Sequence, residues 1–230
     1  MSTFPHRASA PPVPDRRDGR PFFQRTVTEE QQKREDIFLA AATLFANKGY
    51  AGTSVREIVE AAGVTKPTLY YYFKNKEDLY IKLMDEAMAT FAAVLQQAVG
   101  GEGDTRERLK ALFLDIFALF RENVDLLRLI NAMIYGPQGA TPFYDLQGKI
   151  QLLHSVLSQI LKEGISEGKL REERAGSALL LLLGIVRSVQ FHLMVKDPPF
   201  LLTGDQICGA IDLIFDGARQ GLASPPGREG

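Results

Sequence analysis

Apolar residues recur at intervals of three and four positions along most of this chain, and this period is the feature that most constrains its fold. Between positions 29 and 48 one helical face would collect Ile37, Ala40, Ala41, Leu44 and Phe45. The apolar-polar alternation typical of strands is scarce, whereas the helix-favouring residues Ala, Leu, Glu, Gln and Lys fill long windows. We therefore expect an all-α protein.

A break and a second, short helix are expected after this first helix. Gly49 predicts that the first helix ends at Lys48, because glycine enters the left-handed conformation without steric cost. Thr53 or Ser54 can then cap a helix that ends before Gly63. The glycine at that end allows the chain to turn sharply.

A third helix is expected to open at Lys66, with Thr65 as its cap and Pro67 in its first turn. Two short helices with this spacing are typical of a helix-turn-helix, whose second helix enters the major groove of DNA. The residues left outside on that helix would be Lys66, Pro67, Thr68, Tyr70 and Tyr71. A three-helix core with no role in DNA binding would give the same spacing and is the alternative.

The stretch from Gly49 to Tyr80, GYAGTSVREIVEAAGVTKPTLYYYFKNKEDLY, resembles the DNA-binding signature of the tetracycline-repressor (TetR) family. The resemblance implies that double-stranded operator DNA is the partner, with phosphates contacted by Thr53, Thr65, Tyr70 and Lys76. It places Arg56, Lys66, Pro67, Thr68 and Tyr71 toward the bases, and Ser54 completes the expected DNA-binding set. Val59 departs from the family pattern, in which a small alanine is usual between the two helices.

The chain is expected to have four parts. Residues 1–28 are predicted to be a disordered arm, 29–75 the DNA-binding domain, 76–222 a helical regulatory and dimerisation domain, and 223–230 a flexible tail. Asn75 can cap a fourth helix that continues to about Val99. Further helices are expected over 105–123, 124–135, 142–168, 172–195 and 203–222, which makes about nine. The arginines of the arm could follow a minor groove or could simply be solvated.

Residues 178–186 are apolar on every helical face, so something must cover them. The family resemblance implies a homodimer formed through the last two helices. Stripes suited to a symmetric partner are Leu179, Leu183 and Val186, followed by Ile207, Ile211 and Ile214. A wholly intramolecular core is the alternative.

The resemblance also implies a domain that receives a ligand. Aromatic side chains with a few polar groups can line an apolar cavity for a small molecule. The candidates, between the fifth and eighth helices, are Phe117, Phe120, Asn131, Met133, Tyr135, Phe143, Tyr144, His154 and Gln190. The same residues at helical spacing could equally be ordinary core.

Other function classes have no residues to support them. Cys208 is a single cysteine, so no internal disulfide is possible and a cytoplasmic location is expected. The three histidines are scattered, and no catalytic or metal-ligand motif is present, so neither an enzyme nor a cofactor is expected. The apolar run at 178–186 is far shorter than the roughly 20 residues that a bilayer requires, so no membrane partner is expected.

These expectations together describe a DNA-binding transcriptional regulator. It would be a repressor, released from a palindromic operator by a small apolar or amphipathic effector. The alternative is a constitutive or partner-controlled DNA-binding dimer whose second domain only dimerises. Release of DNA by an effector distinguishes the two.

Overall fold

The computed structural model describes residues 28–99, 101, 103–137, 139–196, 198 and 200–219, and within them the chain forms nine α-helices and no strand. They are α1 (Glu29–Gly52), α2 (Val55–Ala61), α3 (Lys66–Tyr72), α4 (Lys76–Val99), α5 (Thr105–Glu122), α6 (Val124–Tyr135), α7 (Gln147–Ser166), α8 (Glu172–Met194) and α9 (Gly204–Arg219). The all-α prediction is confirmed. The predicted arm, apart from Thr28, and the predicted tail lie outside the described residues.

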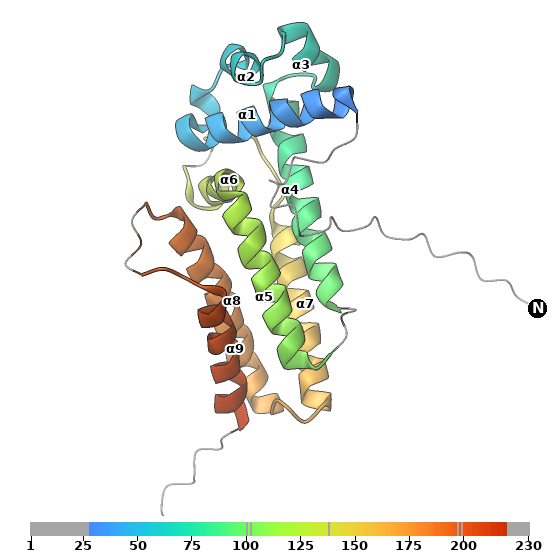
Figure 1. Ribbon diagram of the computed structural model, residues 1–230, viewed down its shortest axis with the longest axis vertical. Coiled ribbons are helices and arrows are strands. Elements are labelled where there is room, and N and C mark those ends of the chain that lie inside the picture. The colour runs from blue at the N-terminus through green and yellow to red at the C-terminus, as the bar shows by residue number, and fades with distance from the viewer. Residues whose placement is uncertain are drawn as a thin grey trace, which may run out of the picture.

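The molecule is elongated, with a small cluster of helices at one end (Figure 1). This cluster contains α1, α2 and α3. From it α4 runs into a larger body that also contains α5, α6 and α7, and α8 and α9 lie along one side of that body (Figure 1).

The small end has its own core, which we call the head core. It is rich in aromatic side chains because α1, α3 and α4 each turn one apolar face inward. The rings of Phe38 and Phe73 lie 5.1 Å apart between centroids, and those of Phe45 and Tyr80 lie 5.5 Å apart. All four side chains are buried, so the first turns of α4 are fixed to the domain that precedes it.

The glycine rule predicted that the first helix ends at Lys48, and the helical path is broken there. Gly49 has a φ of 75° and kinks the chain, but helical turns resume after it and α1 continues to Gly52. The backbone N–H of Thr53 then donates to the carbonyl of Tyr50 at 3.3 Å and ends the helix. The glycine marks the break correctly, and the sequence pattern missed only the short turn beyond it.

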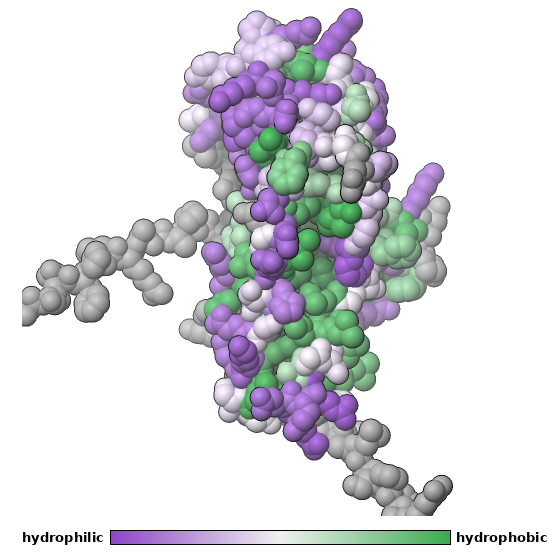
Figure 2. Space-filling view, turned by 180° about the vertical axis from the view of Figure 1, so that it is seen from behind, coloured by the Kyte–Doolittle hydropathy of each residue, from purple (hydrophilic) through white to green (hydrophobic). Residues whose placement is uncertain are grey.

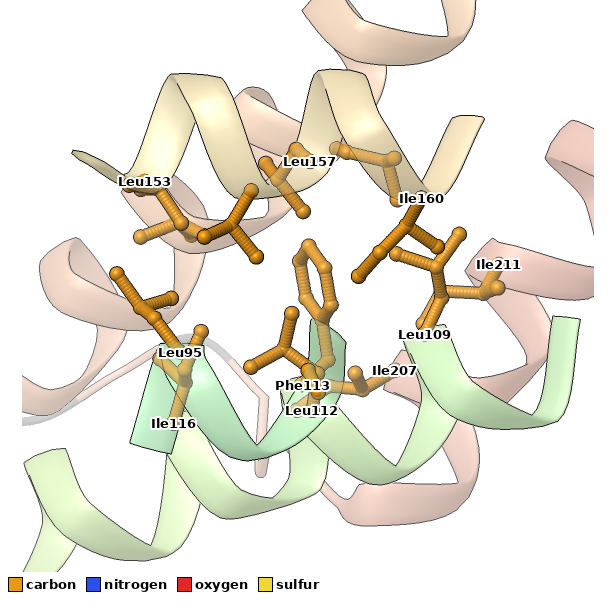
Figure 3. Close-up of a cluster of buried hydrophobic side chains, with 14 of the residues drawn as sticks. Leu95, Leu109, Leu112, Phe113, Ile116, Leu153, Leu157, Ile160, Ile207 and Ile211 are labelled. Carbon is orange, nitrogen blue, oxygen red and sulfur yellow. The ribbon is translucent and has the colours of Figure 1, made fainter. Parts of the chain in front are cut away.

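A second cluster, the body core, fills the space between α4, α5, α7, α8 and α9. The ring of Phe113 points into the middle of the labelled side chains, with Leu157 on α7 opposite and Leu95 on α4 to one side (Figure 3). Ile207 and Ile211 close the cluster from α9 (Figure 3). Burial of apolar side chains in such a cluster is the main stabilising contribution to a helical bundle.

Two helices belong to both parts of the molecule. The first half of α4 supplies Leu83 and Met84 to the head core, and its last turns supply Leu95 to the body core. α6 packs against α1, and there the hydroxyl of Thr43 donates to a carboxylate oxygen of Asp125 at 3.0 Å. A movement of either helix in the body would therefore shift side chains that pack in the head.

The seventh helix begins later than predicted, at Gln147 and not at 142. The chain before it is held in a non-helical path because Tyr144 reaches across to α4, where its hydroxyl donates to Asp85 at 2.9 Å. Leu146 packs against the head core from the same segment. These contacts replace the helical turn that the sequence pattern favoured.

By length and composition alone, α8 is long enough and apolar enough to cross a membrane. The expectation from sequence rested only on the uninterrupted apolar run at 178–186, which ends at Arg187. The whole helix is longer and has apolar residues on both sides of that arginine. A helix in a soluble bundle can pass the same test, and α8 packs along α7 and α9 here.

Arg108 ties together the end of the body far from the head. Its side chain is almost fully buried and donates to the carbonyls of Ala98 and Val99, at 2.9 and 3.0 Å, where α4 ends. It also pairs with the carboxylate of Glu163 on α7. The last carbonyls of a helix have no partner within the helix, so this guanidinium supplies what α4 lacks.

Arg108→Met should lower the free energy of unfolding by about 2–4 kcal/mol, because the buried carbonyls and Glu163 lose a charged partner. Lys162→Met, at an exposed position of α7, is the matched control and should change it by less than about 0.5 kcal/mol. Urea denaturation followed by circular dichroism measures both. Equal losses for the two variants would contradict this role of Arg108.

Candidate functional site

The second helix of the predicted helix-turn-helix, α3, presents an exposed face at the tip of the head. Thr65 caps it, accepting the backbone N–H of Thr68 at 3.3 Å, and the two hydroxyls lie 2.8 Å apart. Leu69 is fully buried and anchors the helix in the head core, whereas Tyr70 and Tyr71 are 51% and 73% exposed. Because Lys66 and Pro67 in the first turn are also exposed, this face is free to approach DNA.

The neighbouring helix α2 is held by a capping box. The hydroxyl of Ser54 accepts the N–H of Glu57 at 3.3 Å, and the Glu57 carboxylate accepts the N–H of Ser54 at 2.8 Å. Lys48 on α1 pairs with the same carboxylate at 2.5 Å. The hydrogen bond from Lys48, followed by those from Ser54, lowers the pKa of Glu57 to about 2. Ser54, and not Thr53, is therefore the cap.

Two of the predicted DNA-binding side chains already have acidic partners. Arg56 pairs with Glu60 one turn along α2 at 2.8 Å, and both side chains are mostly exposed. The hydroxyl of Tyr71 donates to Glu30 at the start of α1 at 3.0 Å, and this hydrogen bond raises the pKa of Tyr71. DNA phosphates would compete with both carboxylates, so these contacts can exchange when the duplex binds.

Two of the predicted phosphate contacts, Thr53 and Lys76, have hydrogen-bond partners within the protein. Thr53 is only 2% exposed, and its hydroxyl lies within hydrogen-bonding distance of the carbonyls of Leu44 and Gly49. The expectation that its side chain contacts a phosphate conflicts with this burial. Lys76 donates to the carbonyls of Tyr50 and Thr53, both at 2.8 Å, so its ammonium group joins the end of α1 to the start of α4.

A cavity of about 340 Å³ lies directly below the head, between α4, α6, α7, α8 and the end of α5. Its walls are mainly apolar side chains: Ala87, Met88, Phe91, Leu119, Phe120, Leu126, Leu127, Ile130, Ile134, Leu146, Ile150, Leu153, Leu183 and Val186. Ala87, Met88 and Leu126 also belong to the head core, whereas Phe120, Leu127, Leu153 and Val186 belong to the body core. The cavity therefore lies where the two cores meet.

The polar lining of the cavity is Asn123, Tyr135, Arg187 and Gln190. Arg187 on α8 donates to the side-chain oxygen of Gln190 at 2.6 Å and to the hydroxyl of Tyr135, the last residue of α6. The guanidinium carbon also lies 5.0 Å from the centre of the Tyr135 ring. Since Tyr135, Arg187 and Ile150 are exposed, this polar group lies where the cavity meets solvent.

Three of the nine predicted pocket residues line the cavity, namely Phe120, Tyr135 and Gln190. The other six do not. Phe117 packs against the body core and Met133 and Tyr144 against the head core, Asn131 donates to the carbonyl of Leu127, Phe143 is 89% exposed, and His154 faces outward. Sequence reasoning missed Arg187, whose place just after an apolar helical run was the available signal.

The stripes of the predicted dimer face point mainly into the molecule, which conflicts with their expected role in an interface. Val186, Ile207, Ile211 and Ile214 are buried in the body core, Leu183 and Val186 line the cavity, and Leu179 packs against the body core. The exposed side chains are Leu180, Leu181 and Phe191 on α8 and Leu213 on α9. Figure 2 shows apolar surface gathered over the body, in contrast to the mostly hydrophilic head.

Comparisons with known proteins agree with this geometry. Residues 37–83 match the family model described as bacterial regulatory proteins, tetR family. A fatty acid metabolism regulator protein of Bacillus subtilis (strain 168) is 30% identical over 150 residues, which cover 64% of this chain and 75% of that protein.

Two solved structures share the fold over nearly their whole length. A fatty acid metabolism regulator of Clostridium perfringens has a TM-score of 0.65 at 30% identity, covering 79% of this chain and 97% of that one. The transcriptional regulator FadR from Bacillus subtilis, in complex with stearoyl-CoA, has a TM-score of 0.59 at 26% identity with the same coverage. The chain belongs to the TetR family of bacterial DNA-binding transcriptional regulators.

Proposed function

We propose that this chain is a ligand-responsive transcriptional repressor that binds a palindromic operator as a homodimer. A small apolar or amphipathic molecule that enters the cavity would lower its affinity for DNA. The observation that supports this proposal most strongly is the position of the cavity, whose walls include Met88 and Leu126 of the head core. A molecule that fills the cavity must touch the packing that positions the helix-turn-helix.

The chemistry of the walls favours a ligand with a long apolar part. Apart from Asn123 and the cluster of Tyr135, Arg187 and Gln190 at the opening, the described lining is hydrocarbon or aromatic, and such surfaces bind apolar groups by the hydrophobic effect. FadR of Bacillus subtilis was solved with stearoyl-CoA, which has a long acyl chain. We therefore propose an acyl chain as the apolar part of the ligand.

The proposed coupling needs two arrangements of α4 and α6 that the ligand and DNA favour differently. A ligand can shift the balance only by its difference in affinity for the two, and typical coupling corresponds to about 5–150-fold in the affinity of the other partner. α4 enters the head core directly, and α6 meets α1 at the Thr43–Asp125 hydrogen bond. Both routes reach the head core, which also holds Leu69 of α3. Access to chromosomal DNA would require a cytoplasmic location.

The operator and the ligand can be tested together. DNA selected from random-sequence pools by the full-length protein should contain two inverted half-sites about one helical turn apart or a multiple of it. Dodecanoyl-CoA or stearoyl-CoA should then weaken binding to the selected site by about 5–150-fold. Selection without sequence enrichment would contradict the DNA-binding role. Undiminished binding with saturating ligand would instead favour the constitutive or partner-controlled regulator.

Base-reading and phosphate contacts should respond differently to substitution, because phosphate contacts position a protein whereas base contacts select the sequence. Arg56→Ala and Lys66→Ala should each cost about 1–3 kcal/mol on the selected site and relax preference at one position per half-site. Tyr70→Phe removes a hydroxyl that would donate to a phosphate, so it should weaken binding to selected and scrambled DNA alike. Lys76→Ala is unsuitable for this purpose because it also removes the hydrogen bonds to the carbonyls of Tyr50 and Thr53 at the end of α1.

Fluorescence anisotropy with selected and scrambled duplexes across a salt series measures both effects. Circular dichroism verifies that each variant remains helical. If Arg56→Ala and Lys66→Ala both keep full discrimination, the assignment of the recognition face is wrong.

We propose that the homodimer forms through the outer faces of α8 and α9. Leu180, Leu181 and Leu213 are exposed there, and contiguous apolar surface of this kind is typical of an interface. Gly184 and Gly209 lie on the same two helices with open space where a side chain would begin. Small residues at these positions would allow two copies of the helix pair to approach closely.

Leu180→Glu should convert the dimer into a monomer that remains helical, because it places a charge in the apolar contact. Leu39→Glu, a half-exposed position of α1 in the head, is the matched control and should remain dimeric. Sedimentation velocity at micromolar concentration distinguishes the two states. A dimeric Leu180→Glu variant would assign the interface to another surface. Leu183→Glu cannot serve here because Leu183 lines the cavity.

A further inference from the structure

The polar group at the open end of the cavity forms a bridge between two helices. Tyr135 is the last residue of α6, and Arg187 lies two-thirds of the way along α8. Their hydrogen bond, together with the ring contact at 5.0 Å, joins the end of α6 to α8 across the cavity. Gln190, one turn further along α8, holds the other arm of the guanidinium at 2.6 Å.

Arg187 has neutral partners where a guanidinium usually has anionic ones. Among the described residues that line the cavity, it is the one with a charged side chain. No described carboxylate forms an ion pair with it, whereas Arg34, Arg56, Arg106, Arg108 and Arg128 each pair with at least one. A phenol and an amide bind a cation less strongly than a carboxylate or a phosphate does. An anion that reaches this position would therefore displace them.

Resting on the proposed function, we propose that the ligand is an amphipathic anion and that Arg187 selects it by its charge. The apolar part occupies the cavity. A carboxylate or phosphate group replaces Tyr135 and Gln190 as the hydrogen-bond acceptor of the guanidinium. Hydrogen bonds between two ionised groups replace ones in which only the guanidinium is charged, so the exchange favours the bound anion. A neutral molecule of the same shape would have to leave the bridge intact and would gain only the apolar contribution.

The same exchange would release α6 from α8. With Tyr135 detached, the end of α6 loses its polar tie to the body, while its other face remains packed against the head through Leu126 and Leu129. α6 is then free to move with α1, which meets it at the Thr43–Asp125 hydrogen bond. The bridge thus links recognition of the anionic group to the position of the DNA-binding head.

Binding of matched probes to the full-length protein tests the proposal by isothermal titration calorimetry. Dodecanoate carries the chain with a carboxylate, dodecanoyl-CoA carries it with phosphates, and methyl dodecanoate carries it with no charge. At least one anionic probe should bind the unmodified protein about tenfold or more tightly than the neutral ester. The stronger of the two anions identifies whether a free carboxylate or a phosphate-bearing carrier is the better head group.

Arg187→Met keeps an unbranched apolar side chain but removes the charge. In this variant the preference for the anion over the neutral ester should fall to less than about threefold, while the ester binds as before. Arg121→Met is the matched control, because Arg121 is exposed on α5, lies over the ring of Phe117 and does not line the cavity. It should keep the full preference.

Tyr135→Phe tests the exchange itself. Removing the hydroxyl leaves one arm of the guanidinium without its neutral partner, so the anion should bind severalfold more tightly than to the unmodified protein. Weaker or unchanged anion binding by this variant would contradict the displacement.

The outcomes separate this proposal from the proposed function. Equal affinity of the unmodified protein for the ester and both anions would agree with an acyl ligand in the cavity but would contradict the role of Arg187. Retention of the full anion preference by Arg187→Met would also overturn it. If no probe binds the folded protein, the acyl ligand of the proposed function fails together with the bridge.

Discussion

The arrangement of this molecule depends on the sharing of α4 and α6 between two hydrophobic cores. A helix buried in one core can shift when that core is repacked, but α4 is buried at both ends, through Tyr80 and Leu83 in the head and Leu95 in the body. Because packed interiors transmit strain and do not absorb it, a change in volume at the junction must be accommodated on both sides. The cavity lies at this junction.

The helix-turn-helix could be predicted from sequence because its signals are local. Caps at Ser54, Thr65 and Asn75 and turns at Gly49 and Gly63 depend on residues within a few positions of one another, and each of these glycines has the positive φ that favours glycine. The start of α7 could not be predicted in this way. It depends on the hydrogen bond between Tyr144 and Asp85, which are distant in sequence.

The two surfaces of the body were harder to assign for a physical reason. In α8 nearly every position between 178 and 186 is apolar, so the period that normally distinguishes the inner from the outer face is absent, and the choice of Leu183 over Leu180 was not constrained. Cavity walls resemble core in sequence, because both need apolar residues at helical spacing. The distinguishing feature was a polar one, the cluster at Tyr135, Arg187 and Gln190, whose members come from two helices.

Under the proposed function, a ligand that fills the cavity would shift α4 and α6 and so move the two DNA-binding heads of a dimer relative to each other. Distances between spin labels measure this directly, with Ala61→Cys on the exposed surface of α2 as the labelled site and Cys208→Ser to remove the native thiol. Electron-electron double resonance would be recorded for the free, DNA-bound and dodecanoyl-CoA-bound protein. We predict that the free distribution overlaps the DNA-bound one and that the ligand shifts it away. An unchanged distribution with saturating bound ligand would contradict the coupling.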